Sequence, residues 1–339
     1  MGMTAVSLLA FAATFSTGFV SVTPDAKATE VGKPVEVTYG DLAPGPFQEA
    51  IVSWNVEPAD TASLRVEIRA KRTEGATKWY RIADWSLDPA TSPRESLKGQ
   101  KDENGNVSTD TLELKNPADA LDLRFTLTKV KDGPDPILRF VSVATSLGEA
   151  KPGTGLPTGV VRTIEVPRKC QGDYPRGGVL CSPTSLSMVL NHYGNVLHRS
   201  DLAKDVPEVQ SNVWDSVYDG AGNWAFNAAY AGSFPGMRGY VARLDSVGDI
   251  ERWIAAGLPV ICSVSFDLLR GKPLSLEESG HLVVLVGFDK EGNPIFNDPA
   301  FKEPRKTYPR ADFEKAWAYS NHTVYLVHPI EANVPPLQR

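Results

Sequence analysis

A cysteine stands directly in front of an apolar helical pattern, where the chain could carry a nucleophile. Cys181 is followed by Pro183, which suits the first turn of a helix because its missing N–H needs no acceptor there. Beyond it, Leu186, Val189, Leu190 and Tyr193 recur at the spacing of one buried helical face, and Gly194 supplies a stop. Unpaired N–H groups and the dipole at a helix amino terminus favour a thiolate over a thiol. The pattern therefore predicts a helix over residues 183–193 with a reactive thiol at its start.

A histidine and a carboxylate about a hundred residues later could serve as the base and its orienting group. His281 opens an apolar run that predicts a buried strand over 282–288, and the turn residues 289–293 lead into a shorter strand over 294–298. An antiparallel hairpin would bring positions 281 and 298 to the same end of the ribbon. A carboxylate beside an imidazole fixes its tautomer and favours the imidazolium that forms when a thiol gives up its proton. Asn297 and Asp298 are both candidates, but neighbours on a strand point to opposite faces, so only one can reach His281.

Several sequence blocks around these residues resemble one known family. They are Cys-Ser-Pro-Thr-Ser at 181–185, Gly-His-Leu-Val-Val at 280–284 with Gly-Phe at 287–288, Asn-Asp-Pro at 297–299, and the blocks at 222–224, 255–260 and 313–317. Residues 165–330 look like the C39-like branch of papain-like cysteine peptidases, relatives of the bacteriocin leader peptidases that cut after a double glycine. The resemblance implies an α+β papain-like domain with Cys181 as nucleophile, His281 as general base and Asp298 as orienting acid. It also makes Gln171 a candidate oxyanion donor.

The implied activity is hydrolysis of a peptide or amide bond through a thioester, so the chain is predicted to be a cysteine peptidase acting on a peptide or protein. Two other functions stay open: an acyl or peptidyl transferase on the same triad, and a catalytically inactive binding module. The inactive alternative is motivated by two departures from the family pattern. Ser182 stands where the family usually has glycine and could crowd the thiol, and Gln171 precedes Cys181 by ten residues, farther than usual.

The other cysteines allow simpler interpretations. Cys262 lies in an apolar strand-like run and is expected in the core. Cys170 could be a free thiol at the edge of the cleft or, outside the cytoplasm, could pair with Cys181. The spacing of the cysteines and histidines lacks the close ligand pairs of structural zinc sites. We therefore expect no metal and no cofactor.

The length of 339 residues suggests two domains. Residues 45–145 alternate with period two, as in Leu64-Val66-Ile68-Ala70 and Leu121-Leu123-Phe125-Leu127, which predicts an antiparallel β-sandwich over 29–150. Its aromatic residues are expected in the core or at sheet edges, with a carbohydrate-binding platform as the alternative: Trp54, Trp79, Tyr80 and Trp85. The formal charge is 35 − 41 = −6 and the basic residues are scattered, so no nucleic-acid partner is expected.

Residues 1–28 combine an apolar stretch with an Ala-Lys-Ala cleavage site and predict a signal peptide, hence a bacterial protein of the cell envelope or secreted from the cell. The alternative is the first strand of the next domain. Polar residues within the stretch disfavour a stable membrane span. A Pro- and Gly-rich linker is expected over 151–163, the peptidase domain over 164–331 and a tail over 332–339. Because the two periodicities differ on either side of this linker, we expect each domain to own a core and residues 160–331 to carry the chemistry alone.

Overall fold

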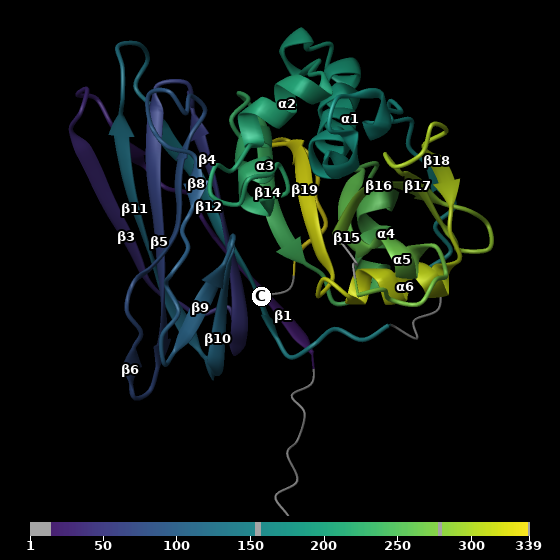
Figure 1. The fold of residues 1–339 in the computed structure, drawn as a ribbon, viewed down its shortest axis with the longest axis horizontal. Helices are drawn as coiled ribbons and strands as arrows, with labels where there is room; N and C mark the ends of the chain where they lie inside the picture. Colours follow the sequence, from purple (N-terminus) through teal and green to yellow (C-terminus); the bar gives the residue numbers. More distant parts are fainter. Residues whose placement is uncertain (1–14, 153–156, 277–279, 338–339) are drawn as a thin grey trace, which may run out of the picture.

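The computed structural model describes residues 15–152, 157–276 and 280–337. An amino-terminal domain of strands lies beside a carboxy-terminal domain that mixes helices with a third sheet (Figure 1). Neighbouring strands in all three sheets run antiparallel. The chain thus has the expected order of an antiparallel β domain followed by a domain of mixed helices and strands.

The amino-terminal domain contains two sheets. The first has the order β1 (Ser16–Val22), β12 (Ile137–Leu147), β4 (Phe47–Glu57), β10 (Thr111–Ala118) and β9 (Gly105–Ser108), with β2 (Ala26–Lys27) also beside β12. The second has the order β3 (Pro34–Leu42), β11 (Ala120–Lys129), β5 (Ala62–Arg72), β7 (Tyr80–Ser86) and β8 (Glu95–Ser96), with β6 (Gly75–Ala76) beside β5. Apolar side chains of both sheets form one hydrophobic core.

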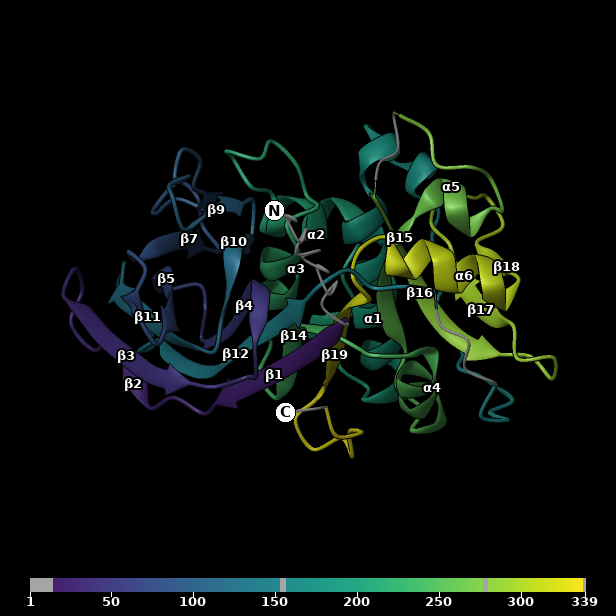
Figure 2. The same ribbon diagram turned by 90° about the horizontal axis from the view of Figure 1, so that it is seen from below.

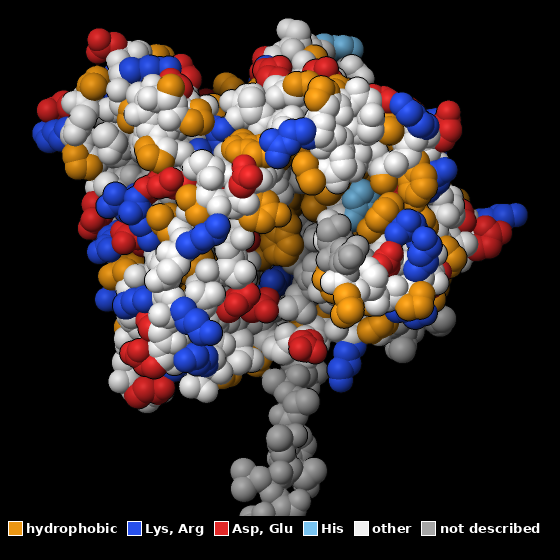
Figure 3. Space-filling model, in the orientation of Figure 1, with side chains coloured by type: hydrophobic (Ala, Val, Ile, Leu, Met, Phe, Trp, Pro, Cys, Tyr) orange, Lys and Arg blue, Asp and Glu red, His pale blue; other side chains and the backbone are white. Residues whose placement is uncertain are grey.

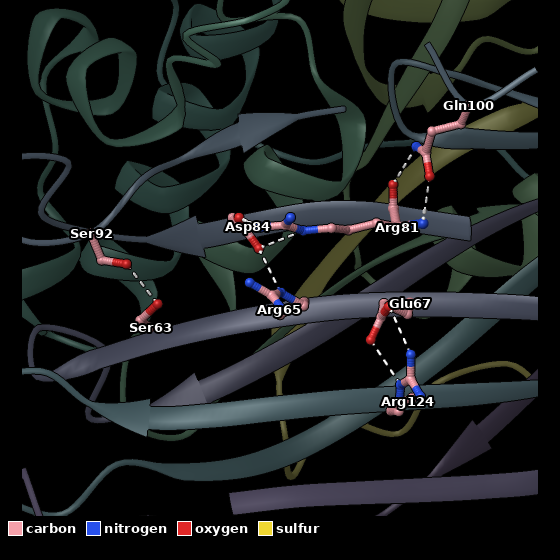
Figure 4. Close-up of polar contacts among 8 residues, drawn as sticks. All are labelled: Ser63, Arg65, Glu67, Arg81, Asp84, Ser92, Gln100 and Arg124. Atoms are coloured by element: carbon pink, nitrogen blue, oxygen red, sulfur yellow. Dashed lines mark hydrogen bonds and ion pairs between the residues drawn. The ribbon is translucent and has the colours of Figure 1, made fainter. Parts of the chain in front are cut away.

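The period-two pattern of β5 and β11 fixes their register. Leu64, Val66, Ile68 and Ala70 are all fully buried, and each lies directly opposite a buried residue of β11. The residues that alternate with them along the strands point to the opposite face and form ion pairs there, such as Arg124 with Glu67 and Arg65 with Asp84 (Figure 4). Trp54, Tyr80 and Trp85 are fully buried, so these aromatic residues fill the core and cannot form an exposed carbohydrate platform.

The segment predicted as a signal peptide is only partly described, because residues 1–14 lie outside the described residues. Its remainder takes the form of the alternative, a first strand: β1 pairs with β12 from Ser16 opposite Leu147 to Val22 opposite Val141. Export stays a prediction. In the part of the chain that the structure describes, no helix has the length and apolar character needed to cross a bilayer.

The carboxy-terminal sheet has the order β14 (Met237–Arg243), β19 (Thr323–Pro329), β15 (Val260–Ser265), β16 (Gly280–Phe288), β17 (Pro294–Asn297) and β18 (Arg305–Thr307), with β13 (Arg162–Thr163) also beside β16. The helices are α1 (Cys181–Val196), α2 (Val206–Val213), α3 (Trp224–Ala231), α4 (Val247–Ala255), α5 (Phe266–Leu269) and α6 (Arg310–Ala318). Three 3₁₀ turns, η1 (Gln171–Asp173), η2 (Gly177–Val179) and η3 (Ser200–Leu202), flank α1. The predicted helix over 183–193 corresponds to α1. Sequence patterns missed α2, α6 and β14, and β13 lies within the predicted linker.

Each domain has its own hydrophobic core, but each core also includes a few residues of the other domain. Ile51 and Phe140 of the amino-terminal domain belong to the core of the carboxy-terminal domain, whereas Ala225, Phe226 and Ala229 of α3 belong to the core of the amino-terminal domain. Figures 1 and 2 both show α3 and β14 against β4 and β12.

Polar contacts cross the same interface between the domains. Asn55 Nδ2 donates to Gly239 O at 2.7 Å, and Val241 N donates to Ser53 Oγ at 2.9 Å. The buried Arg243 guanidinium pairs with Glu49 at 2.5 Å. Side chains on β4 thus use the edge of β14 that faces away from β19, so the two domains are built to pack together.

Candidate active site

Cys181 is the first residue of α1, as the sequence predicts, and its side chain is partly exposed. Helix α1 packs against β16, and Ser185 Oγ donates to Leu282 O at 2.9 Å. This contact joins the helix that carries the cysteine to the strand that carries the histidine. Cys181 consequently lies within hydrogen-bonding reach of His281.

The β16–β17 hairpin brings His281 and Asp298 together at one end. Leu285 pairs with Phe296 and Val284 with Asn297, so Asp298 follows the last paired residue near the start of β16. His281 Nε2 lies 2.7 Å from Asp298 Oδ1, and both side chains are buried. The other ring nitrogen is left for the thiol. The three residues singled out from the sequence therefore form one connected chain of groups.

Asn297 occupies a different environment. Its Nδ2 donates to Val166 O at 3.0 Å, and its Oδ1 accepts from Arg305 Nε at 2.7 Å. The alternation expected along a strand explains why it turns away from His281 while Asp298 turns toward it.

The charges of the three groups support one another. Burial raises the pKa of the Cys181 thiol, but the hydrogen bond and the charge of His281 outweigh burial and leave that pKa below its usual value. Burial lowers the pKa of His281, but Asp298 and the thiolate reverse this effect and raise the pKa to about 10. Burial also raises the pKa of Asp298, and bonds from His281, Tyr308 and the Ala300 N–H more than compensate, so the carboxyl pKa is lowered. Both shifts favour the thiolate–imidazolium pair over the neutral thiol and imidazole.

Sequence reasoning missed two residues that support this pair. Tyr308 Oη donates to Asp298 Oδ2 at 2.6 Å and occupies the second carboxylate oxygen. Phe266 packs against the imidazole of His281, with 4.5 Å between ring centroids and 52° between the ring planes. Tyr308 lies in the short connection between β18 and α6, where no periodicity marks it. Phe266 ends the apolar run that contains Cys262, where an aromatic residue is ordinary.

Ser182 does not crowd the thiol. Its side chain is buried, and its Oγ lies 3.0 Å from Tyr325 Oη of β19, on the sheet side of the helix. Ser182 is also absent from the described lining of the cavity that contains Cys181. The departure from the family glycine is thus accommodated in the core.

Gln171 lies in η1, and the intervening loop folds back on it. Its backbone N–H donates to Pro299 O at 2.8 Å, one residue beyond Asp298. A Cβ at Gly177 would lie 2.3 Å from Gln171 O, so only glycine permits this close approach. Gly177 begins η2, which ends just before Cys181. The Gln171 side-chain oxygen is buried and has no hydrogen-bond partner among the described residues.

The three cysteines are all free, so Cys170 and Cys181 are not joined by a disulfide bond. Cys170 is buried beside Gly172 in η1. Cys262 is fully buried in β15, and burial raises its thiol pKa well above the usual value. Cys262 is therefore a core residue, as the sequence predicts.

A cavity of about 670 Å³ opens beside Cys181 at the junction of the two domains. One wall comes from the amino-terminal domain, through Glu49, the turn 108–111 and Glu113. The opposite wall includes Cys181, the segment 218–222 and Leu282 of the carboxy-terminal domain. The space-filling view shows this junction, with hydrophobic side chains exposed along it (Figure 3).

Comparison with known proteins identifies both domains. Residues 163–325 match the Peptidase_C39 like family, and residues 36–146 match the Peptidase C39 N-terminal domain. The carboxy-terminal domain of this chain therefore belongs to the Peptidase_C39 like family, which confirms the resemblance seen in the sequence blocks. This membership supports a function of the cysteine peptidase type.

Solved structures give weaker likenesses. A Bacillus anthracis protein assigned as a C39-like peptidase is 18% identical with a TM-score of 0.31, over 52% of this chain and 98% of its own. The Aeromonas sobria serine protease in complex with the chaperone ORF2 is 12% identical with a TM-score of 0.25, over 41% of this chain and 28% of its own. FlhE is 16% identical with a TM-score of 0.23, over 40% of this chain and 99% of its own. No curated protein matches the sequence. Scores this low carry no weight for function.

Proposed function

We propose that this protein is a cysteine peptidase that hydrolyses peptide or amide bonds with Cys181, His281 and Asp298 as its triad. The observation that supports this most directly is the position of His281, which bonds Asp298 at 2.7 Å and the Cys181 thiol at the start of α1. Nucleophile, base and orienting acid in one hydrogen-bonded series is the arrangement that thiol acyl transfer needs. On this proposal the carboxy-terminal domain has the papain-like fold, the amino-terminal domain is a β-sandwich, and the protein acts outside the cytoplasm.

The reaction would proceed in two halves. The Cys181 thiolate attacks the carbonyl carbon, and the resulting tetrahedral intermediate expels the amine, which takes a proton from the His281 imidazolium. The neutral imidazole then removes a proton from water, the hydroxide attacks the thioester carbonyl, and the acid leaves as the thiol is released. Asp298 keeps the ring oriented and stabilises its charged form in both halves. Every proton passes through His281, so no metal is required by these steps.

The oxyanion of the intermediate needs donors close to the thiol. The first N–H groups of α1 point out of the helix beside Cys181, as at any helix amino terminus. We propose Gln171 as the side-chain donor, because η1 and η2 fold back toward the start of α1. A Gln171→Ala variant is expected to lower the hydrolysis rate about 10²- to 10³-fold, the usual loss for one oxyanion donor.

Selective alkylation tests the proposal. At pH 6, iodoacetamide should label Cys181 before Cys170 or Cys262, because only Cys181 shares a proton with a histidine, and peptide mapping identifies the site. A His281→Ala variant should lose this preference, whereas His198→Ala, which alters a histidine outside the site, should retain it. Preferential labelling of Cys170 or Cys262 in the native protein would overturn the assignment. Addition of amines to the reaction would then separate hydrolysis from acyl or peptidyl transfer by the product formed.

A further inference from the structure

The segment 214–223, between α2 and α3, forms the cavity wall beside Cys181. Tyr218 is 49% exposed and lines this cavity together with Cys181. A Cβ at Gly220 would lie 2.7 Å from Tyr218 Cε1. Glycine at that position therefore allows the Tyr218 ring to pack against the backbone where it lines the cavity.

A fully buried carboxylate holds this segment from within. Asp215 Oδ1 accepts from the N–H groups of Val217 and Tyr218, both at 3.0 Å, and Oδ2 accepts from Asn223 Nδ2 at 2.9 Å. The Asn223 side chain in turn caps α3 by accepting from Phe226 N at 3.0 Å. The conformation of Tyr218 is thus tied to the start of α3.

The amino-terminal domain holds the two ends of the same segment. At the first end, Arg94 Nε donates to Trp214 O at 2.8 Å, and the N–H of Ser96 donates to Asp215 Oδ1 at 3.1 Å. At the other end, Asp110 Oδ2 accepts from Trp224 N at 2.5 Å, and the carboxylate also bonds the N–H of Ala225. Asp110 therefore satisfies the first two N–H groups of α3 across the interface, and Asn223 satisfies the third.

Burial of the charged Asp110 carboxylate is unfavourable, and its hydrogen bonds to the first N–H groups of α3 offset this penalty. Burial raises the pKa of the Asp110 carboxyl to about 6, and the N–H groups of Trp224 and Ala225 oppose that rise. The preceding residue, Thr109, has φ = 56°, a region that β-branched residues rarely adopt. The β9–β10 turn is thus shaped to place a carboxylate at α3, next to the cavity that contains Cys181.

We propose that Asp110 is a positioning residue of the active site: it holds the segment 214–223 in place, so that Tyr218 contacts a peptide substrate bound between the two domains. This inference rests on the proposed function and adds that the amino-terminal domain forms part of the substrate site. It predicts that a loss of Asp110 impairs reaction with peptides more than reaction with small reagents, because the thiol and its base remain intact.

Two thiol reagents of different size test this in the full-length protein. Iodoacetamide reports the reactivity of the thiol, and benzyloxycarbonyl-alanyl-alanyl chloromethyl ketone also requires the peptide site. For Asp110→Ala we expect labelling of Cys181 by the peptide reagent to slow at least about tenfold, while labelling by iodoacetamide stays within about threefold of the native rate. Asp110→Asn should restore most of the peptide labelling, because the amide oxygen can accept from Trp224 N.

Control variants separate the outcomes. Glu67→Ala removes a carboxylate whose partner Arg124 lies in the same domain, and it should react like the native protein with both reagents (Figure 4). Native-like rates for a folded Asp110→Ala, or equal slowing with both reagents, would overturn the inference. If Asp110→Ala does not fold, Tyr218→Ala replaces it, with the same selective slowing expected and native rates contradicting it. An unreactive Cys181 in the native protein would instead refute the proposed function, and this inference with it.

Discussion

Replacement of Asp298 by asparagine should uncouple the thiol from its base while keeping the shape of the site. The carboxylate raises the pKa of His281 through a buried bond of 2.7 Å. An opposite charge at this distance shifts a pKa by about 1–3 units, and each unit corresponds to about 1.4 kcal/mol. The imidazolium loses this stabilisation in Asp298→Asn. The thiolate that depends on the imidazolium should therefore form only at higher pH.

The rate of Cys181 alkylation by iodoacetamide, measured from pH 5 to pH 10, reports this change. We expect the acid limb of the profile to move up by about 1–3 pH units, so labelling at pH 6 falls roughly 10- to 1000-fold. Asp289→Asn is the matched control, because Asp289 caps the turn at the other end of the same hairpin through bonds to Glu291 N and Asn293 N. An Asp298→Asn variant that is folded and shows the native pH profile would refute the role of Asp298.

Four further changes test the supports of the site. Tyr308→Phe removes a bond to the Asp298 carboxylate and should lower the free energy of unfolding by about 1.5–3 kcal/mol in a urea titration; no change would mean that the bond contributes nothing. Ser182→Ala leaves the buried Tyr325 hydroxyl without this partner and should cost about 1–3 kcal/mol with unchanged alkylation of Cys181, whereas faster alkylation would mean that the serine does obstruct the thiol. The pKa of His281 is raised from 6.5 to about 10, so its contribution to stability is complete below pH 6.5 and is lost as pH rises through about 10. The pKa of Asp298 is lowered, so its contribution to stability is complete above pH 3.8 and is lost on acidification. The difference in stability between the native protein and Asp298→Asn should therefore be largest between pH 3.8 and pH 6.5. A difference that does not depend on pH would contradict the coupling of the two groups. A chain truncated to residues 160–337 exposes Phe226, whose burial contributes about 1.5–3 kcal/mol to stability. This chain should melt at a lower temperature than the full chain. Equal melting temperatures would mean that the domains are independent.

Local patterns were enough to predict the elements that carry the site. The helix after Cys181 and the hairpin between His281 and Asp298 each depend on short-range signals: a proline in the first turn, apolar periodicity and a run of turn residues. The alternation on β5 and β11 likewise predicts which residues are buried, because each strand buries one face. Each of these signals lies in residues that are close together in the chain, so a single sequence is enough to predict these elements.

Residues that support the active site from distant segments are not marked by any local sequence pattern. Tyr308, between β18 and α6, and Phe266, the first residue of α5, contact the pair of His281 and Asp298 only once the sheet has formed. Ser182 illustrates the same limit, since its hydroxyl points into the core and contacts Tyr325 of β19. Whether a departure from a family motif disables a site thus depends on the direction of one side chain, which spacing does not specify.

The relation between the domains shows why a change of periodicity is weak evidence for independent units. A Pro- and Gly-rich segment does separate an all-strand region from a mixed one, but α3 inserts Phe226 into the first core while β4 supplies Ile51 to the second. An apolar residue on a helix contributes equally to the pattern whether it packs on its own sheet or on the neighbouring domain. The same ambiguity hides Asp110, which looks like a turn residue in the sequence and becomes the cap of a helix in the other domain. Since the cavity beside Cys181 has walls from both domains, the amino-terminal domain must be considered part of the site when substrates are sought.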